Sequence, residues 1–409
     1  MDNILYWVWL SEICSPSTAV FKTLFTSFGS IEKIYDHTFK ETEGFSDIPK
    51  RIIQALNNKS TDRAEKIIKT CKKKNIGILT YSDTLYSARL RNIQNPPVLL
   101  YYKGELPSFD ESVCIGTVGT RTPTDYGKRC AYEFIFDMTL GGACIVSGMA
   151  SGIDAVCHTA ALDAGGKTVA VLGCGVDIIY PSENTKLYND ICLNGTVISE
   201  YAPGTSPSRF TFPQRNRIIS GLSLGTLIIE AQIKSGAMIT AKIAKEQGRD
   251  LFALPGRVGE ANSLGPNDLI KNGAFAVNSA RDVLKKYEFL YPDKIDIGRC
   301  SDPTAKELKT VDLKPFYSQE KKTTEEPNIP ELWENDPIDA PSADKLKKYD
   351  SLPDDQKNIC ILLSESSPLT AEDISNGTKV SVSDTMSSLT ILEIQGIVKA
   401  MPGGTYVLS

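Results

Sequence analysis

The sequence has very few histidines, no closely paired cysteines and no long hydrophobic run. Its 409 residues include two histidines and ten cysteines, and the cysteines are scattered without any C-x-x-C pair. A structural zinc site needs four clustered ligands, so we expect no metal, and nothing in the chain indicates another cofactor. Several cysteines lie inside apolar runs such as Val113-Cys114-Ile115, where the thiol acts as a small core side chain. This use of cysteine is typical of the reducing cytoplasm.

The sequence also contains no segment typical of a signal sequence or a membrane span. The apolar stretch Ile4–Leu10 has no basic residue before it and is too short for a signal sequence or a membrane span. No other segment approaches a spanning length. We therefore expect a cytoplasmic protein without membrane contacts.

An overall basic charge is absent too. The formal net charge is −5, from 45 Lys and Arg against 50 Asp and Glu. This balance argues against a protein that coats nucleic acid through a generally positive surface. Any nucleic-acid site must therefore be a local basic patch on an acidic protein.

The chain is too long for one ordinary hydrophobic core, and its pattern changes along its length. Residues 1–72 carry apolar residues at three- and four-residue spacing, which predicts a small helical bundle of SAM-like or helix-hairpin character. Within it, Phe28-Gly29-Ser30 predicts the end of one helix and the cap of the next. This pattern is as typical of a packing module as of a binding module.

Residues 73–290 alternate short Val- and Ile-rich runs with helical segments. Strands that alternate with helices at this spacing predict βαβ units and a parallel sheet buried on both faces. Right-handed crossovers then give an α/β, Rossmann-like, doubly wound fold. The expected strands are Val113–Val118, Ala143–Ser147, Thr168–Leu172, Thr196–Ser199, Thr226–Ile229, Asp250–Ala253 and Phe275–Val277, and the expected helices include Tyr126–Leu140, Ile153–Ala164, Ala237–Gln247 and Asn267–Lys271.

The last part of the chain has two further patterns. Residues 291–350 are rich in proline and acidic residues and poor in apolar ones, so we expect a flexible linker. Residues 351–409 predict three helices and a hairpin around Pro402-Gly403-Gly404, the outline of a winged-helix domain. Such domains bind DNA or proteins. Only Lys379 and Lys399 lie near the relevant elements, so the sequence favours DNA binding by this unit only weakly.

Three glycine turns follow three successive expected strands. They are Gly119-Thr120-Arg121, Ser147–Asp154 and Gly173-Cys174-Gly175. The carboxyl ends of parallel strands meet at one edge of the sheet, where open α/β folds bind ligands. Glycine lets the backbone approach a phosphate, helix N-terminal amides attract it, and Arg121 would add a charged contact. Each turn alone is equally compatible with a structural connection.

The segment Arg209–Arg217 carries the strongest signal. It contains three arginines, two phenylalanines and no acidic residue, in a chain that is acidic overall. Arginine binds phosphates, and aromatic rings or guanidinium planes stack on unpaired bases. The alternative is that the phenylalanines are core residues and the arginines pair with acids such as Glu200 and Glu230.

Glu230 is open to two interpretations. Because it follows an expected strand, it could be a catalytic base, or it could pair with Arg215 or Arg217 and shape the site. The chain has no Ser-His-Asp order, no pair of catalytic carboxylates and no nucleotide-hydrolysis motif. His158 lies in an apolar helical segment that faces the same region, and we expect it to be structural. These features predict a protein that is not an enzyme.

Together these segments resemble the DNA-processing protein A family (DprA, also called Smf). The matching stretches follow one another in order between about residues 75 and 290: Val118–Thr122, Ser147–Asp154 with His158, Gly173–Pro181, Phe212–Ser220, Glu230–Ala241 and Leu254–Gly256. The family has a Rossmann-like core, often with a helical N-terminal domain and a winged-helix C-terminal domain. The resemblance implies a homodimer that binds incoming single-stranded DNA and loads RecA recombinase onto it during natural transformation.

The resemblance also implies which residues bind DNA. The family's Gly-x-Arg turn corresponds to Gly119 and Arg121, with Thr120 where the family usually has serine. Its Arg-Asn-Arg segment corresponds to 215–217, and a lysine after the Tyr-Pro pair corresponds to Lys186. The expected DNA contacts are Gly119, Thr120, Arg121, Ser147, Gly148, Gly152, Lys186, Phe212, Arg215, Asn216, Arg217, Ser235 and Gly236, and the residues expected to shape the site are Asp154, His158 and Glu230.

An enzyme is the main alternative. Gly225-Thr226 followed by Glu230 resembles the Gly-Thr-x-x-Glu end of the lysine-decarboxylase-like nucleotide phosphoribohydrolases, which share a related core. In that interpretation Glu230 is the catalytic carboxylate. The glutamate comes one residue later than in the motif, and Leu222-Ser223-Leu224 stands where the motif has Gly-Gly, so both differences weaken it. A nucleotide-sensing module that uses the same glycine turns is a third possibility.

Overall fold

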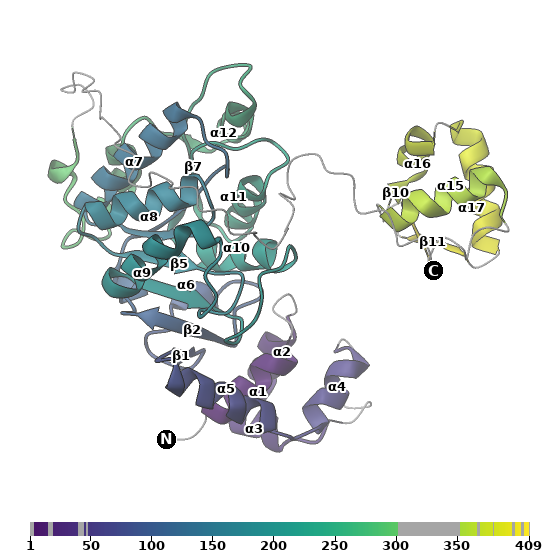
Figure 1. Ribbon diagram of the computed structural model, residues 1–409, viewed down its shortest axis with the longest axis horizontal. Coiled ribbons are helices and arrows are strands. Elements are labelled where there is room, and N and C mark those ends of the chain that lie inside the picture. Colours follow the sequence, from purple (N-terminus) through teal and green to yellow (C-terminus); the bar gives the residue numbers. More distant parts are fainter. Residues whose placement is uncertain are drawn as a thin grey trace. The chain divides into compact units, whose positions relative to one another are not determined.

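The computed structural model divides the chain into two compact units, Met1–Lys321 and Lys322–Ser409, and each is described by itself (Figure 1). The structure describes residues 4–14, 19–39, 45, 48–301, 352–365, 369–378, 380–394, 397–401 and 405–408. Among these residues, no helix is long and apolar enough to cross a membrane. Nor do three or more His, Cys, Asp or Glu side chains of the described chain form a group that could hold a metal ion.

The described residues at the start of the first unit form five helices whose apolar faces pack together. They are α1 (Ile4–Ile13), α2 (Val20–Phe28), α3 (Ile31–Asp36), α4 (Lys50–Asn57) and α5 (Asp62–Lys73). After α2, Gly29 adopts a φ of 73° and donates its N–H to the carbonyl of Phe25. The hydroxyl of Ser30 then accepts the N–H of Lys33 and caps α3. The predicted helix end and cap are therefore confirmed.

A nine-stranded sheet follows in the described part of this unit. Its strands are β1 (Gly77–Thr80), β2 (Leu99–Gly104), β3 (Cys114–Val118), β4 (Cys144–Ser147), β5 (Thr168–Val171), β6 (Thr196–Ser199), β7 (Gly225–Ile228), β8 (Asp250–Ala253) and β9 (Phe275–Ala276). Their spatial order is β1-β2-β6-β5-β4-β3-β7-β8-β9. Strands β3 to β9 pair in parallel, so every predicted strand is present and the predicted α/β core is confirmed.

The sheet is mixed, however, and not purely parallel. The sequence pattern does not predict β1 and β2, which extend the sheet beyond β6 in antiparallel pairs. Neither strand belongs to a βαβ unit, because only the short helix α6 (Ala88–Arg91) separates them. The alternation that identifies the other strands is therefore absent here.

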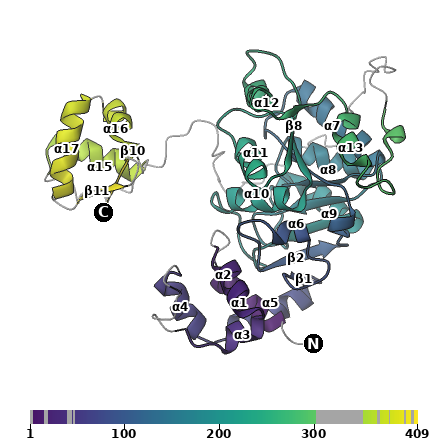
Figure 2. The ribbon, with the colours of Figure 1, turned by 180° about the vertical axis from the view of Figure 1, so that it is seen from behind.

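Helices cover both faces of the sheet (Figures 1 and 2). The helices that follow β3 are α7 (Asp125–Leu140), α8 (Ile153–Asp163), α9 (Thr185–Asn194), α10 (Thr211–Leu222), α11 (Gly236–Glu246), α12 (Ala261–Lys271) and α13 (Ala280–Glu288). Short 3-10 helices occur at Phe109–Glu111, Ser182–Asn184 and Ile297–Arg299. Successive strand residues point to opposite faces. In β5, Val169 and Val171 join the core beneath α10 and α11, whereas Ala170 joins the core beneath α9 and the N-terminal helices. The sheet is doubly wound as predicted.

The arginine-rich segment 209–217 contains the start of a helix that the sequence pattern does not predict. α10 begins at Thr211, so Pro213 occupies its first turn. The first N–H groups of a helix have no partner within the helix, and a proline there loses no helical hydrogen bond. Arg215 and Arg217 therefore lie on a helix that packs against the sheet, whereas Arg209 precedes it.

The segment that follows α13 packs on the core before the described part of the unit ends. Ile295 and Cys300 are buried beside α7, and Asp296 donates its N–H to the carbonyl of Gly141. Residues 291–301, which the sequence analysis assigns to a linker, are thus part of this packing. The remainder of the predicted linker lies outside the described residues.

The described part of the second unit contains three helices and a small sheet. They are α15 (Asp354–Glu365), α16 (Ala371–Thr378), α17 (Val382–Ile394), β10 (Leu369–Thr370), β11 (Val398–Met401) and β12 (Thr405–Leu408). β12 lies between β10 and β11 and pairs antiparallel with both. Ile359, Ile374 and Leu389 lie at the centre of its core. The predicted helices and hairpin strands are present, while Lys379 and the turn 402–404 lie outside the described residues.

Candidate nucleic-acid interface

The three glycine turns lie side by side at one edge of the sheet. β5, β4 and β3 are neighbours and run in the same direction, so the segments that follow them emerge together. The first turns of α10 lie against two of these segments. A Cβ atom at Gly173 would lie 2.8 Å from the ring of Phe212, and one at Gly148 would lie 2.2 Å from the guanidinium of Arg215. We call residues 119–122, 147–154, 173–181 and 209–217 the carboxyl edge.

The first turn, 119–121, is held by its backbone. Thr120 donates its N–H to the carbonyl of Glu230 at 2.7 Å and accepts the N–H of Ile153 at 3.1 Å. Gly119 packs so tightly on Ile153 that a Cβ would lie 2.6 Å from that side chain. These contacts leave Arg121 exposed at the tip of a rigid turn.

The side chain of Glu230 holds the start of α7. Its two carboxylate oxygens accept the N–H and the hydroxyl of Thr124 at 2.9 and 2.5 Å. A Cβ at Gly127 would lie 2.3 Å from the carboxylate, so the first turn of α7 packs directly on it. A carboxylate at a helix N-terminus also interacts favourably with the helix dipole. Because Glu230 is buried and both oxygens are engaged, the geometry does not favour its use as a catalytic base.

The second turn is organised around Asp154. Its carboxylate accepts the N–H groups of Gly148 and Ala150 at 3.1 and 3.4 Å. Burial raises the pKa of Asp154, and the charge of Arg215 and these N–H groups oppose the rise. Ser147 is fully buried and donates its hydroxyl to the carbonyl of Thr117 at 2.6 Å. Its side chain therefore joins β4 to β3 and is not presented to a ligand.

Arg215 lies beneath the turns. It has 4% of its surface exposed, and its Nη1 donates to the carbonyl of Val171 at the end of β5. Among the described residues its Nε has no hydrogen-bond partner. Burial lowers the pKa of Arg215 to about 10, so the side chain is charged at neutral pH. The guanidinium therefore lies between Gly148, which follows β4, and Val171, the last residue of β5.

His158 is a neutral core residue. Its Nδ1 lies 2.7 Å from the hydroxyl oxygen of Thr168, which donates its own hydrogen to the carbonyl of Ile145 at 2.9 Å. The hydroxyl has only one hydrogen, so Nδ1 must be the donor to it. Burial lowers the pKa of His158 to about 3, and the charge of Arg215 acts in the same direction. These contacts agree with the structural role expected from the sequence.

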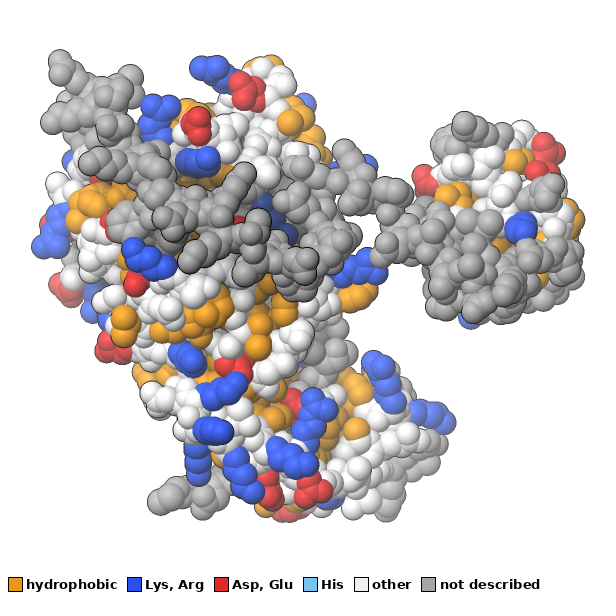
Figure 3. All heavy atoms as spheres, in the orientation of Figure 1, with side chains coloured by type: hydrophobic (Ala, Val, Ile, Leu, Met, Phe, Trp, Pro, Cys, Tyr) orange, Lys and Arg blue, Asp and Glu red, His pale blue; other side chains and the backbone are white. Residues whose placement is uncertain are grey.

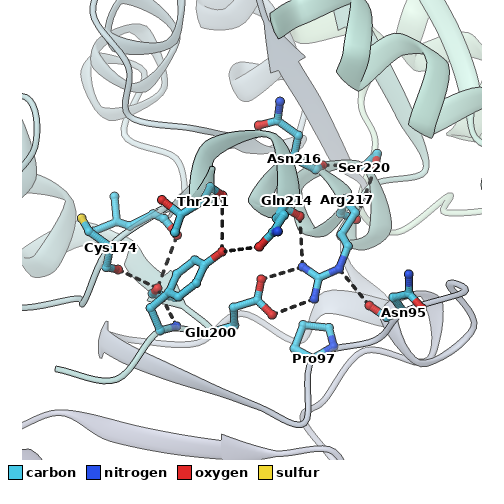
Figure 4. A network of polar contacts seen from close by, with 12 residues as sticks. Asn95, Pro97, Cys174, Glu200, Thr211, Gln214, Asn216, Arg217 and Ser220 are labelled. Atoms are coloured by element: carbon cyan, nitrogen blue, oxygen red, sulfur yellow. Dashed lines mark hydrogen bonds and ion pairs between the residues drawn. The ribbon is translucent and has the colours of Figure 1, made fainter. Parts of the chain in front are cut away.

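Arg217 forms a buried ion pair with Glu200, and Figure 4 shows the two side chains facing each other. Nη1 and Nη2 lie 2.6 Å from the two carboxylate oxygens. Nε donates to the carbonyl of Asn95 at 2.9 Å, and Nη1 also donates to that of Gln214 at 3.1 Å. Burial disfavours the charged guanidinium, but the adjoining Glu200 outweighs it and raises the pKa of Arg217. This geometry does not support the DNA contact expected of Arg217. It supports the alternative, in which Arg217 pairs with Glu200.

An exposed cation and two aromatic rings lie together at the carboxyl edge. The guanidinium carbon of Arg121 is 5.7 Å from the ring centre of Phe212. Phe212 in turn stacks on Tyr180, with 5.4 Å between the ring centres and 28° between the planes. Nearby in the chain, Arg209 lies 5.0 Å from the ring centre of Phe210, which is 67% exposed. Tyr180 is not among the DNA contacts expected from the sequence, although its place in the family-matching stretch Gly173–Pro181 was a signal.

The remaining predicted contacts lie in the carboxyl edge or at the starts of α9 and α11. Asn216 donates its Nδ2 to the carbonyl of Gly236 at 3.5 Å, so α10 and the start of α11 meet there. Ser235 precedes α11 and donates its hydroxyl to the carbonyl of Gln232 at 2.7 Å. Lys186 is exposed on the first turn of α9. Gly152 begins α8 beneath the first turn, where no side chain fits, since a Cβ would lie 2.5 Å from two carbonyl oxygens.

Comparison with known proteins identifies the family. Residues 77–288, more than half of the chain, match the model of the family described as DNA recombination-mediator protein A. The chain belongs to this family. Protein Smf of Synechocystis sp., a curated relative, is 33% identical over 413 residues, which cover 98% of both chains. The resemblance found in the sequence is thus confirmed.

Streptococcus pneumoniae provides both a related sequence and a related solved structure. Its DNA processing protein DprA is 43% identical over 207 residues, which cover 51% of this chain and 73% of that protein. An X-ray structure of DprA from the same organism has a TM-score of 0.60 at 32% identity and covers 70% of this chain and 98% of that one. Members of the DNA recombination-mediator protein A family therefore share the α/β core described above.

Proposed function

We propose that this protein binds single-stranded DNA at the carboxyl edge and does so without catalysing a reaction. The observation that carries the proposal is the stack of the exposed Arg121 on the half-buried rings of Phe212 and Tyr180, beside a rigid glycine turn. Arginine pairs with phosphate, and an aromatic ring with an accessible face stacks on a base that is not paired. Duplex DNA keeps its bases inside the helix, so such a stack favours a single strand. Relatives in Bacillus subtilis and Streptococcus pneumoniae are named DNA processing protein DprA, which supports a role on DNA.

Each predicted site residue takes one of two roles in the proposal. The contact residues meet the strand, and the positioning residues hold the contact residues from below. We assign Gly119, Thr120, Arg121, Gly152, Lys186, Phe212, Asn216, Ser235 and Gly236, together with Tyr180, to contact. We assign Ser147, Gly148, Asp154, His158, Arg215, Arg217 and Glu230 to positioning.

Family membership supports finer parts of the proposal. We infer that the protein is a cytoplasmic homodimer that loads RecA recombinase onto the bound strand during natural transformation. We also assign residues 1–72 to a SAM-like domain, 73–290 to the Rossmann-like core and 351–409 to a winged-helix domain. Assembly of RecA on strands already coated by the full-length protein tests the loading step. If RecA assembles no faster there than on strands coated by an unrelated single-strand binding protein, that step is wrong.

Replacing Arg121 by alanine is expected to weaken binding of single-stranded DNA by about 1–3 kcal/mol, because one phosphate contact and one stacking plane are lost. Fluorescence anisotropy with labelled single and double strands, measured over a range of salt concentrations, provides the values. The unaltered protein should bind the single strand more tightly, and its affinity should fall steeply as salt rises.

Arg299 provides the matched control. Its side chain is 71% exposed, and its segment contacts Gly141 at the far end of α7, away from the carboxyl edge. Arg299→Ala removes the same charge and should leave the affinity unchanged. Equal binding of single and double strands, or equal effects of the two substitutions, would contradict the proposed interface.

A further inference from the structure

The helix α5 carries a row of exposed lysines that the candidate interface does not include. Five lysines and no acidic residue occur between positions 66 and 74, in a chain of net charge −5. Ala64, Ile67 and Cys71 form the buried stripe of the helix. Lys66, Lys69 and Lys73 lie on the opposite face, because they follow one another at three- and four-residue spacing. Figure 3 shows Lys and Arg side chains gathered on the surface formed by the N-terminal helices.

Helix stability explains only part of this row. Lysines in the last turn, such as Lys72 and Lys73, interact favourably with the helix dipole. Asp62 and Glu65 lie four residues before Lys66 and Lys69, a spacing at which opposite charges stabilise a helix. Like charges three and four residues apart destabilise a helix, and Lys66–Lys69 and Lys69–Lys73 are such pairs. An external anion that binds all three lysines would relieve this repulsion.

The row is connected to the carboxyl edge through its last lysine. Lys74 Nζ lies 2.5 Å from the carboxylate of Asp177, in the segment that follows β5. The other oxygen of Asp177 accepts the N–H of Gly204 at 2.8 Å. Three residues after Asp177 comes Tyr180, whose ring stacks on Phe212. The C-terminal end of α5 therefore contacts the same loop that supplies the aromatic stack, and Lys74 neutralises the acid at that junction.

We propose that Lys66, Lys69 and Lys73 bind the phosphates of the same DNA strand after it leaves the carboxyl edge. This inference rests on the proposed function and adds a second, sequence-independent contact region to it. The three lysines are about 4.5 and 6 Å apart along the helix axis, a spacing that suits successive phosphates of an extended strand. α5 has 12 residues and is about 18 Å long, so it binds a few nucleotides only. A short DNA strand that only fills the carboxyl edge would not reach the lysines of α5.

The test compares strand lengths in the full-length protein. Homothymidine strands of about 6 and about 20 nucleotides bracket the range of single-strand sites. In the triple variant Lys66→Gln, Lys69→Gln and Lys73→Gln, affinity for the long strand should fall roughly tenfold at low salt. The slope of log affinity against log salt should become shallower by about 2, since each single-strand phosphate contact contributes about 0.7. Affinity for the short strand should not change.

Two matched variants separate charge from position. Lys66→Arg, Lys69→Arg and Lys73→Arg keep the charges and should keep long-strand affinity. Lys242→Gln, Lys245→Gln and Lys271→Gln remove three exposed charges from α11 and α12 and should have no effect on it. If both glutamine variants behave alike, the α5 contact is wrong while the carboxyl edge stands. If the unaltered protein does not bind even the short strand, the proposed function fails, and the inference fails with it.

An anionic lipid surface is the competing partner for such a row. Sedimentation with phosphatidylcholine vesicles that contain about 30% phosphatidylglycerol tests it, because lysines near a membrane surface are attracted to anionic headgroups. We expect no sedimentation of the protein with these vesicles. Sedimentation that the glutamine variant of α5 abolishes, together with unchanged long-strand affinity, would assign the row to lipid and overturn the proposal.

Discussion

Replacing Arg217 by alanine is expected to lower the free energy of unfolding by about 3–5 kcal/mol, the usual cost of leaving one member of a buried ion pair without its partner. Glu200 is buried, and both of its oxygens lie 2.6 Å from the Arg217 guanidinium. The same guanidinium donates to the carbonyls of Asn95 and Gln214, so these acceptors also lose their donor. Urea unfolding followed by circular dichroism measures the change.

A double variant separates the ion pair from the space that it fills. Glu200→Leu with Arg217→Met replaces two charges by apolar side chains of similar size and should recover most of the lost stability. Arg299→Ala, at an exposed position, should stay within about 0.5 kcal/mol of the unaltered protein. A different result would be informative: if Arg217→Ala unfolds normally but binds single-stranded DNA weakly, then Arg217 is a contact residue and its positioning role is wrong.

Much of the fold follows from the pattern of apolar residues. Strands β3 to β9 are short, mostly apolar runs separated by helices, and this alternation has few solutions other than a doubly wound sheet. The alternation of strands and helices does not predict β1 and β2, because strands that pair antiparallel need no crossover helix between them. The pattern does not predict α10 either, because Pro213 in its first turn is more typical of a loop than of a helix interior.

The candidate site is harder to predict than the fold. The sequence indicates that residues 209–217 are rich in arginine, but it does not indicate where each guanidinium points. Within the segment Arg215 and Arg217 face the core and Arg209 is exposed, as is Arg121 in the first glycine turn. Whether Glu200 reaches an arginine 17 positions later depends on the packing of α10 against the sheet. Such contacts are formed by tertiary structure, and residue types alone do not determine them.

Gly152→Ala is expected to destabilise the protein by about 2–6 kcal/mol and to weaken single-strand binding as well. Gly152 has a φ of 77° and a ψ of −126°, a conformation that residues with a Cβ rarely adopt and that costs about 1–3 kcal/mol. The added Cβ would also lie 2.5 Å from the carbonyl oxygens of Thr120 and Arg121. The turn would have to move, at a further cost of about 1–3 kcal/mol. Anisotropy and urea unfolding, measured on the same preparation, provide both values.

Gly165 is the control for this substitution. It has a φ of 72°, but no atom lies within 4 Å of the place that a Cβ would take. Gly165→Ala should therefore cost only about 1–2 kcal/mol and leave DNA binding unchanged. The comparison isolates the contact with Arg121, because both substitutions strain the backbone and only Gly152→Ala displaces the turn. If both variants bind the strand equally well, the position of the 119–121 turn does not matter, and the DNA contact must lie elsewhere on the protein.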